Sequence, residues 1–146
     1  MSLNPPRLYQ GCILAMVVIY VLLPSTRLVF FPANLLGLPV FLGGAWLAVV
    51  AKRQFQKSRT PLSVNATSET LHTSGVYRLS RNPMYLGITI GLSGLALLLS
   101  AWPNLLFPVL FILVMDRFFV QQEEKSLQEH FGQSYRDYQR QVRRWI

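Results

Sequence analysis

The stretch GVYRLSRNPMYLG, from Gly75 to Gly87, combines cationic, aromatic and polar residues immediately before an apolar run. The surrounding chain is mostly hydrophobic, with 51% apolar and only 14% charged residues among 146. This composition is far from that of a soluble globular domain and indicates a membrane protein. A polar segment at the mouth of an apolar run is therefore expected to do more than join two helices.

Four apolar runs around this stretch are predicted to be membrane helices, at residues 8–23, 35–51, 84–101 and 105–120. A helix of about 17 residues reaches roughly 25 Å, which is short for a bilayer core, so local thinning or partial embedding is expected. The first run lacks a strongly basic start and a small-residue cleavage pattern. It is therefore interpreted as a retained helix rather than a cleaved signal peptide.

Charge is distributed unevenly along the chain, whose net charge is +8. Basic residues crowd the predicted loop 52–81 and the tail 123–146, whereas Arg27 is the sole charged residue between Leu8 and Val50. By the positive-inside rule both termini and this loop are predicted to be cytoplasmic, in a bacterial or archaeal inner membrane or an endomembrane. Because the cations flank apolar spans, they indicate contact with anionic lipid headgroups rather than nucleic acid. No protein partner is evident.

The tail 123–146 carries an apolar stripe at helical spacing, formed by Leu127, Phe131, Tyr135, Tyr138, Val142 and Trp145. Its arginines fall on the opposite side. The tail is predicted to be an amphipathic helix, bent at Gly132, that lies along the membrane surface or folds under the bundle. The chain is thus expected to form a single all-α integral membrane domain, 1–146, with about four transmembrane helices and this interfacial helix.

Metal chemistry is not expected. Cys12 is the single cysteine and lies in an apolar run, where a packing role is expected. His72 and His130 are far apart and lack a metal-ligand spacing, so no protein-bound metal is predicted. His72 is interpreted as a loop residue.

Three glycines, Gly87, Gly91 and Gly94, share one side of the third predicted helix. Small residues there allow a close approach of either a neighbouring helix or a ligand. Both interpretations remain open at this point.

The ends of the third and fourth predicted helices offer opposite charges to one pocket. Asn82-Pro83 signals a helix start, with Pro83 at the first helical position and Asn82 or Ser80 as the cap. Free N–H groups there, beside arginines, would bind a carboxylate or phosphate, and Glu123-Glu124 would bind a cation. A zwitterionic amino acid moiety or a phosphoethanolamine headgroup fits both ends. Alternatively, the glutamates are solvated residues that open the tail.

The chain from Phe55 to Ile146 resembles the isoprenylcysteine carboxyl methyltransferase and phospholipid N-methyltransferase superfamily of integral membrane methyltransferases. The resemblance rests on Leu71–Arg78, Arg81–Gly87, Glu123-Glu124, Leu127, Phe131-Gly132, Tyr135, Tyr138, Val142 and Arg144. It implies S-adenosylmethionine as the methyl donor, bound on the cytoplasmic side between the last two helices and the tail.

The resemblance, together with the two ends of the pocket, assigns candidate site residues. The predicted cofactor-binding residues are Gly75, Tyr77, Arg81, Asn82, Pro83, Tyr85, Leu86, Gly87, Glu123 and Glu124. The predicted catalytic residues are Tyr85, Glu124 and Arg144.

Asn82 departs from the carboxyl methyltransferase branch, which usually has His there, and is familiar in the phospholipid-methylating branch. An amide cannot act as a general base, so an amine or thiol acceptor would need another proton acceptor, whereas a carboxylate needs none. A phospholipid amine or other small lipophilic nucleophile is favoured as acceptor. Alternatives are O-methylation of isoprenylcysteine, thiol S-methylation, an NADPH-dependent membrane reductase and a non-catalytic membrane adaptor.

Overall fold

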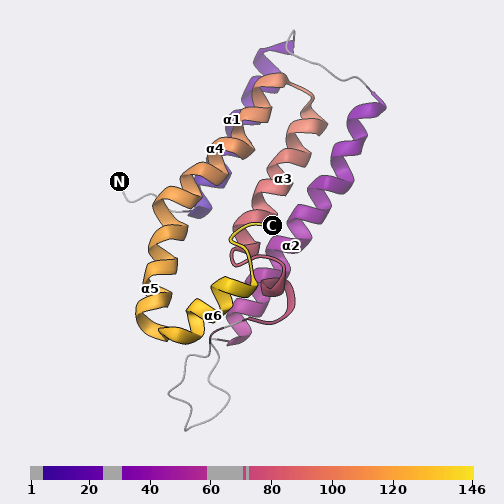
Figure 1. Ribbon diagram of the computed structural model, residues 1–146. Coiled ribbons are helices and arrows are strands. Elements are labelled where there is room, and N and C mark those ends of the chain that lie inside the picture. Colours follow the sequence, from indigo (N-terminus) through magenta and orange to yellow (C-terminus); the bar gives the residue numbers. More distant parts are fainter. Residues whose placement is uncertain (1–4, 25–30, 59–70, 72) are drawn as a thin grey trace.

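The computed structural model describes residues 5–24, 31–58, 71 and 73–146, and every regular element in them is helical. Figure 1 shows the long helices side by side in one bundle, with the short C-terminal helix folded back at one end. The predicted all-α architecture is confirmed. Arg27, the loop residues 59–70 and His72 lie outside the described residues. The principal helices are α1 (Pro5–Leu22), α2 (Gly37–Ser58), α3 (Pro83–Leu99), α4 (Leu106–Met115), α5 (Gln121–Phe131) and α6 (Gln133–Gln141).

The bundle presents its apolar side chains outward as well as inward. Three helical segments of the described chain, Pro5–Leu22, Ala33–Gln56 and Trp102–Phe131, are long and apolar enough to cross a membrane, and α3 is a shorter apolar helix. Large side chains such as Leu14 and Leu113 are exposed on the outer surface. An apolar outer surface is stable only in a nonpolar solvent, so the protein is an integral membrane protein.

Helix α2 continues seven residues past its predicted end at residue 51, to Ser58. The added sequence, KRQFQKS, leaves the apolar run but consists largely of good helix formers. The helix therefore continues beyond the last residue of the apolar run. The first part of the predicted loop is an extension of α2 that carries Phe55 beside the start of α3.

Helices α2 and α3 pack along their lengths through glycines. A Cβ added at Gly44 would lie 2.2 Å from the backbone nitrogen of Gly91, and one at Gly87 would lie 2.5 Å from that of Ala48. At Gly94 it would lie 2.2 Å from the nitrogen of Phe41. Gly87 and Gly94 therefore serve close helix packing. The predicted cofactor contact of Gly87 stays a prediction.

Helices α4 and α5 form one continuous rod joined by a π-helical turn, Asp116–Val120. The rod ends at Gly132, whose φ of 53° permits the sharp bend into α6, so the predicted bend is present. The tail folds back against one end of the bundle, and its predicted position at the membrane surface stays a prediction. Tyr138 donates a hydrogen bond of 2.7 Å to the carbonyl of Tyr77, and Tyr135 is fully buried.

Candidate functional site

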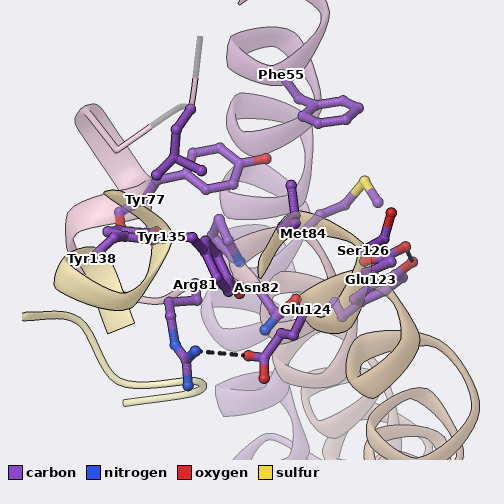
Figure 2. A pocket seen from close by; sticks show the side chains of 14 residues that line it. Phe55, Tyr77, Arg81, Asn82, Met84, Glu123, Glu124, Ser126, Tyr135 and Tyr138 are labelled. Carbon is purple, nitrogen blue, oxygen red and sulfur yellow. Dashed lines mark hydrogen bonds and ion pairs between the residues drawn. The ribbon is translucent and has the colours of Figure 1, made fainter. Parts of the chain in front are cut away.

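A cavity of about 350 Å³ lies where α2, α3, α5 and α6 meet (Figure 2). This volume is within the range of small-molecule sites. The lining is mixed, with aromatic, aliphatic and charged side chains contributed by segments that are distant in sequence. The lining residues are Phe55, Leu71, Tyr77, Arg81, Asn82, Pro83, Met84, Tyr85, Glu123, Glu124, Ser126, Leu127, Tyr135 and Tyr138.

The start of α3 forms one end of this cavity. Pro83 is the first helical residue and Asn82 the N-cap, as predicted, but the Asn82 side chain makes no capping bond. The Ser80 hydroxyl instead accepts a hydrogen bond of 3.1 Å from the Asn82 N–H and donates one of 2.9 Å to the Arg144 carbonyl. The first N–H groups of a helix have no intrahelical partners, so this end favours an anionic group.

Arg81 adds positive charge at the same end. Its guanidinium Nη1 lies 3.1 Å from Glu124 Oε1, and Figure 2 shows the pair at the cavity edge. Its Nε is buried and finds no hydrogen-bond partner among the described residues. A donor left unsatisfied at the wall of a cavity is costly unless a ligand accepts from it.

Glu124 is committed to protein partners. It is only 7% exposed and, besides Arg81, it accepts hydrogen bonds of 3.2 and 2.7 Å from Nε and Nη2 of Arg144. Arg144 also donates a 3.2 Å bond to Asp116. Burial of a carboxylate is tolerated when it is paired in this way. Glu124 therefore already has its charge paired with two arginines, and the predicted cation binding by the two adjacent glutamates stays a prediction.

Glu123 remains accessible at the cavity. Its Oε1 accepts a 3.0 Å hydrogen bond from the hydroxyl of Tyr85, which is itself buried. Glu123 is thus the lining carboxylate that keeps an accessible surface. The cavity combines an anion-attracting end at Arg81 and α3 with a cation-attracting group at Glu123.

Tyrosines form the remaining wall between η3 (Gly75–Arg78) and α6. Burial, and secondarily the negative charge of Glu123, raises the pKa of Tyr77 to about 12. Burial also raises the pKa of Tyr138 and of Tyr135. These phenols stay protonated at neutral pH. The hydroxyls of Tyr77 and Tyr138 already donate to the carbonyls of Ala51 and Tyr77, so this wall offers mainly the flat faces of its rings, which suit an aromatic ligand.

The structure brings most of the predicted cofactor-binding residues to one cavity, including Tyr77, Asn82 and Glu123. Three of them do not line it. Gly75 adopts a φ of 63° and contacts the Gln54 side chain, Gly87 packs against α2, and Leu86 is buried elsewhere in α3. Of the predicted catalytic residues, Tyr85 and Glu124 line the cavity, while Arg144 contacts it through Glu124.

Several lining residues were not predicted as site residues. Tyr135 and Tyr138 were visible in the stripe of the tail, but a stripe of this spacing does not distinguish a packing face from a ligand wall. Phe55 lay in a predicted loop. Asp116, which does not line the cavity but contacts Arg144, was the single acidic residue inside an apolar run, a signal that could have marked it.

A second, apolar cavity of about 540 Å³ lies on the other side of the first turn of α3, against α1 and α2. Met84 and Tyr85 line both cavities, so they form the partition between them. The walls of this apolar groove are mainly aliphatic and include Ile13, Val49 and Leu92, with Lys52 adding a positive charge.

The fold and site together define a helical membrane protein in which a small-molecule cavity that carries charged side chains, called the polar cavity below, adjoins an apolar groove. Residues 32–134 match the model of the phospholipid methyltransferase family. The chain belongs to this family, so the resemblance noted in the sequence is confirmed.

Curated relatives are similar over part of their length. Probable protein-S-isoprenylcysteine O-methyltransferases from Oryza sativa subsp. indica and subsp. japonica are each 41% identical over 75 residues. The match covers 49% of this chain and 38% of each rice protein, so the chain spans well under two thirds of these relatives. An uncharacterized protein of Haemophilus influenzae is 38% identical over 63 residues, which are 43% of this chain and the whole of that protein.

Proposed function

We propose that this protein is an S-adenosylmethionine-dependent methyltransferase that acts on a lipophilic acceptor, with a phospholipid amine as the favoured class. The observation that carries the proposal is the pair of adjoining cavities, one that carries charged and tyrosine side chains and one that is mainly aliphatic, which share Met84 and Tyr85 as a wall. A reaction between a polar cofactor and a lipid needs two such compartments that meet at one point.

The charged and aromatic groups of the polar cavity match the charged and aromatic groups of S-adenosylmethionine. The unsatisfied Nε of Arg81 and the start of α3 would hold the amino acid carboxylate. Glu123 would hold the ammonium group, and the tyrosine wall would contact the adenosine. When bound, the cofactor supplies a methyl group on a positively charged sulfur. Glu124, whose charge is already paired with two arginines, is assigned a supporting role.

The residues of this chain contribute alignment and exclusion of water rather than acid-base chemistry. Tyr85 is fixed by Glu123 at the partition, where the acceptor must meet the methyl group. Asn82 cannot accept a proton as a base. In-line displacement at a positive sulfur is favoured by a water-poor site, since transfer disperses or moves that charge.

The apolar groove would take the hydrocarbon part of the acceptor. The groove is bounded by α1, α2 and α3, and small residues such as Ala45, Ala48 and Gly91 form part of its wall. Lys52 would attract a headgroup phosphate, and this supports a phospholipid over an uncharged lipid. The positive-inside pattern supports a cytoplasmic position for the polar cavity and both termini.

A second candidate is O-methylation of a prenylated cysteine, which the names of the two rice relatives favour. That acceptor is a carboxylate and needs no base, in agreement with Asn82. It would still place an apolar chain in the groove, so the acceptor must be identified by experiment.

The direct test is incubation of the purified protein with labelled S-adenosylmethionine and total membrane extract, followed by identification of the labelled product. A labelled phospholipid supports the favoured class, and labelled prenylcysteine the second. Calorimetry in detergent checks cofactor binding. Thermal protection by NADPH instead of S-adenosylmethionine would indicate a reductase. Absence of both binding and methyl incorporation would indicate an adaptor and overturn the proposal.

A further inference from the structure

The segment after α6, residues 142–146, passes beside the start of α3 and is held there by backbone contacts. The Arg81 N–H donates a 3.0 Å hydrogen bond to the carbonyl of Arg143, and the Ser80 hydroxyl donates to that of Arg144. Trp145 packs against the core of the bundle. This C-terminal segment therefore supports the residues that form the anion-attracting end of the cavity.

The side chain of Arg144 ties this segment to the α4–α5 rod at two points. Its Nε and Nη2 contact Glu124, and its Nη1 lies 3.2 Å from Oδ1 of Asp116. Glu124 in turn holds Arg81, the cationic residue of the cavity wall. Asp116 is thus the outermost member of a chain of charges that ends at the cavity.

Asp116 opens the π-helical turn that joins α4 to α5. A π turn inserts one residue, which rotates the following helix by about 100° relative to an uninterrupted α-helix. This rotation sets the directions of Glu123 and Glu124, which follow on α5. An acidic residue in an otherwise apolar helix is costly without a partner, and Arg144 provides one.

Resting on the proposed function, we propose that Asp116 is a positioning residue for the cofactor cavity. Through Arg144 it orients Glu124 and Arg81, and it keeps the C-terminal segment closed against α3. Asp116 does not line the cavity, so it would act on the cofactor without touching it.

The first experiment is steady-state kinetics of Asp116→Asn with the labelled lipid acceptor. We expect the KM for S-adenosylmethionine to rise about tenfold while kcat changes less than about threefold, because a charge-assisted contact that orients the site is weakened. Asp116→Glu should recover most of the loss. The matched control is Asp137→Asn, which removes an exposed ion pair with Arg140 and is not among the residues that line the cavity.

The pair Asp116 and Arg144 is tested by a double-mutant cycle on the dissociation constant for S-adenosylmethionine. If Asp116 acts through Arg144, Asp116→Asn should add almost nothing to Arg144→Gln. Additive effects would overturn the proposed route. A rise in KM with an equally large fall in kcat, neither of which Asp116→Glu recovers, would show that Asp116 has only a structural role. That result would also overturn the proposal.

A measurement made without cofactor tests this inference independently of the proposed function. Limited trypsin digestion should cleave after Arg143 about tenfold faster in Asp116→Asn than in wild type or Asp137→Asn, because the C-terminal segment opens more often. Equal rates in all three proteins would contradict the closure. If wild type binds no S-adenosylmethionine, the function fails, yet the digestion rates still decide whether Asp116 holds the segment.

Discussion

Glu123 and Glu124 are adjacent in the chain but occupy different environments. Glu124 is buried among guanidinium groups from both sides of the site, whereas Glu123 is accessible and is contacted by the Tyr85 hydroxyl. One carboxylate therefore stabilises the site, and the other is available to a ligand.

The two glutamates are predicted to respond differently to neutralisation. Glu124→Gln leaves two arginines without their carboxylate and should cost about 2 kcal/mol, reduced from a fully buried pair because Arg144 is partly exposed. The unfolding temperature in detergent should fall by roughly 5 °C. Glu123→Gln should leave the melting temperature nearly unchanged but weaken S-adenosylmethionine binding in calorimetry about tenfold. Equal effects of both substitutions on both measurements would contradict this division.

Tyr85 offers a conservative test of the partition between the cavities. Tyr85→Phe keeps the buried ring but removes the hydroxyl that donates to Glu123. We expect kcat to fall about tenfold, because Glu123 and the ring lose their mutual orientation. Tyr9→Phe, in the groove but away from Glu123, is the matched control. Wild-type turnover in Tyr85→Phe would show that the hydroxyl has no part in alignment.

Many residues of the cavity could be predicted from the sequence, whereas the partners that they contact could not. The Asn82-Pro83 helix start and its neighbouring cations depend on local rules of capping and charge, and they could be predicted. The pairing of Glu124 with Arg144 could not. It depends on a π turn at Asp116 and on the path of the tail, both of which are set by tertiary packing.

At the scale of elements, the crossing of α2 and α3 is fixed by glycines on both helices. The glycine side of α3 was recognisable from its spacing, but the choice between helix packing and ligand approach was not. Gly44, on α2, is its counterpart and fits against the backbone of Gly91. The choice depended on which helix lies opposite, and that is tertiary information.

Gly43 and Gly44 are adjacent on α2, and substituting each of them by alanine tests this crossing with a matched control. Gly44→Ala should separate the helices, because the new Cβ would meet backbone atoms 2.2 Å away that cannot move independently. We expect a loss of about 1–3 kcal/mol in detergent unfolding. Gly43→Ala places its Cβ in open space and should be neutral or gain up to about 1 kcal/mol from helix propensity. Equal stability of the two variants would contradict the packing described.

At the scale of the whole molecule, the polar cavity and the apolar groove meet only at the first turn of α3 among the described residues. The groove belongs to the first three helices, whereas the cavity depends on α5 and α6. The apolar runs of α1 and α2 carry no motif, so no site residue could be predicted in them. Their contribution is a shaped surface, which arises only once the helices are packed.

A substitution that fills the groove should therefore weaken the use of the lipid acceptor and leave the binding of S-adenosylmethionine nearly unchanged. Gly91 lines the groove, and a Cβ there has its nearest neighbours at 3.9 Å, an ordinary contact distance, so Gly91→Leu adds side-chain volume at this wall. The KM for the lipid acceptor should rise about tenfold, since the added side chain occupies volume needed by its hydrocarbon chain. Calorimetric affinity for S-adenosylmethionine should change less than about twofold, because Gly91 lies outside the polar cavity. Gly11→Leu, on an open face of α1, is the control for added hydrophobicity. An unchanged acceptor KM in Gly91→Leu would place the lipid elsewhere, while parallel loss of cofactor affinity would mean that the two cavities do not act as separate compartments.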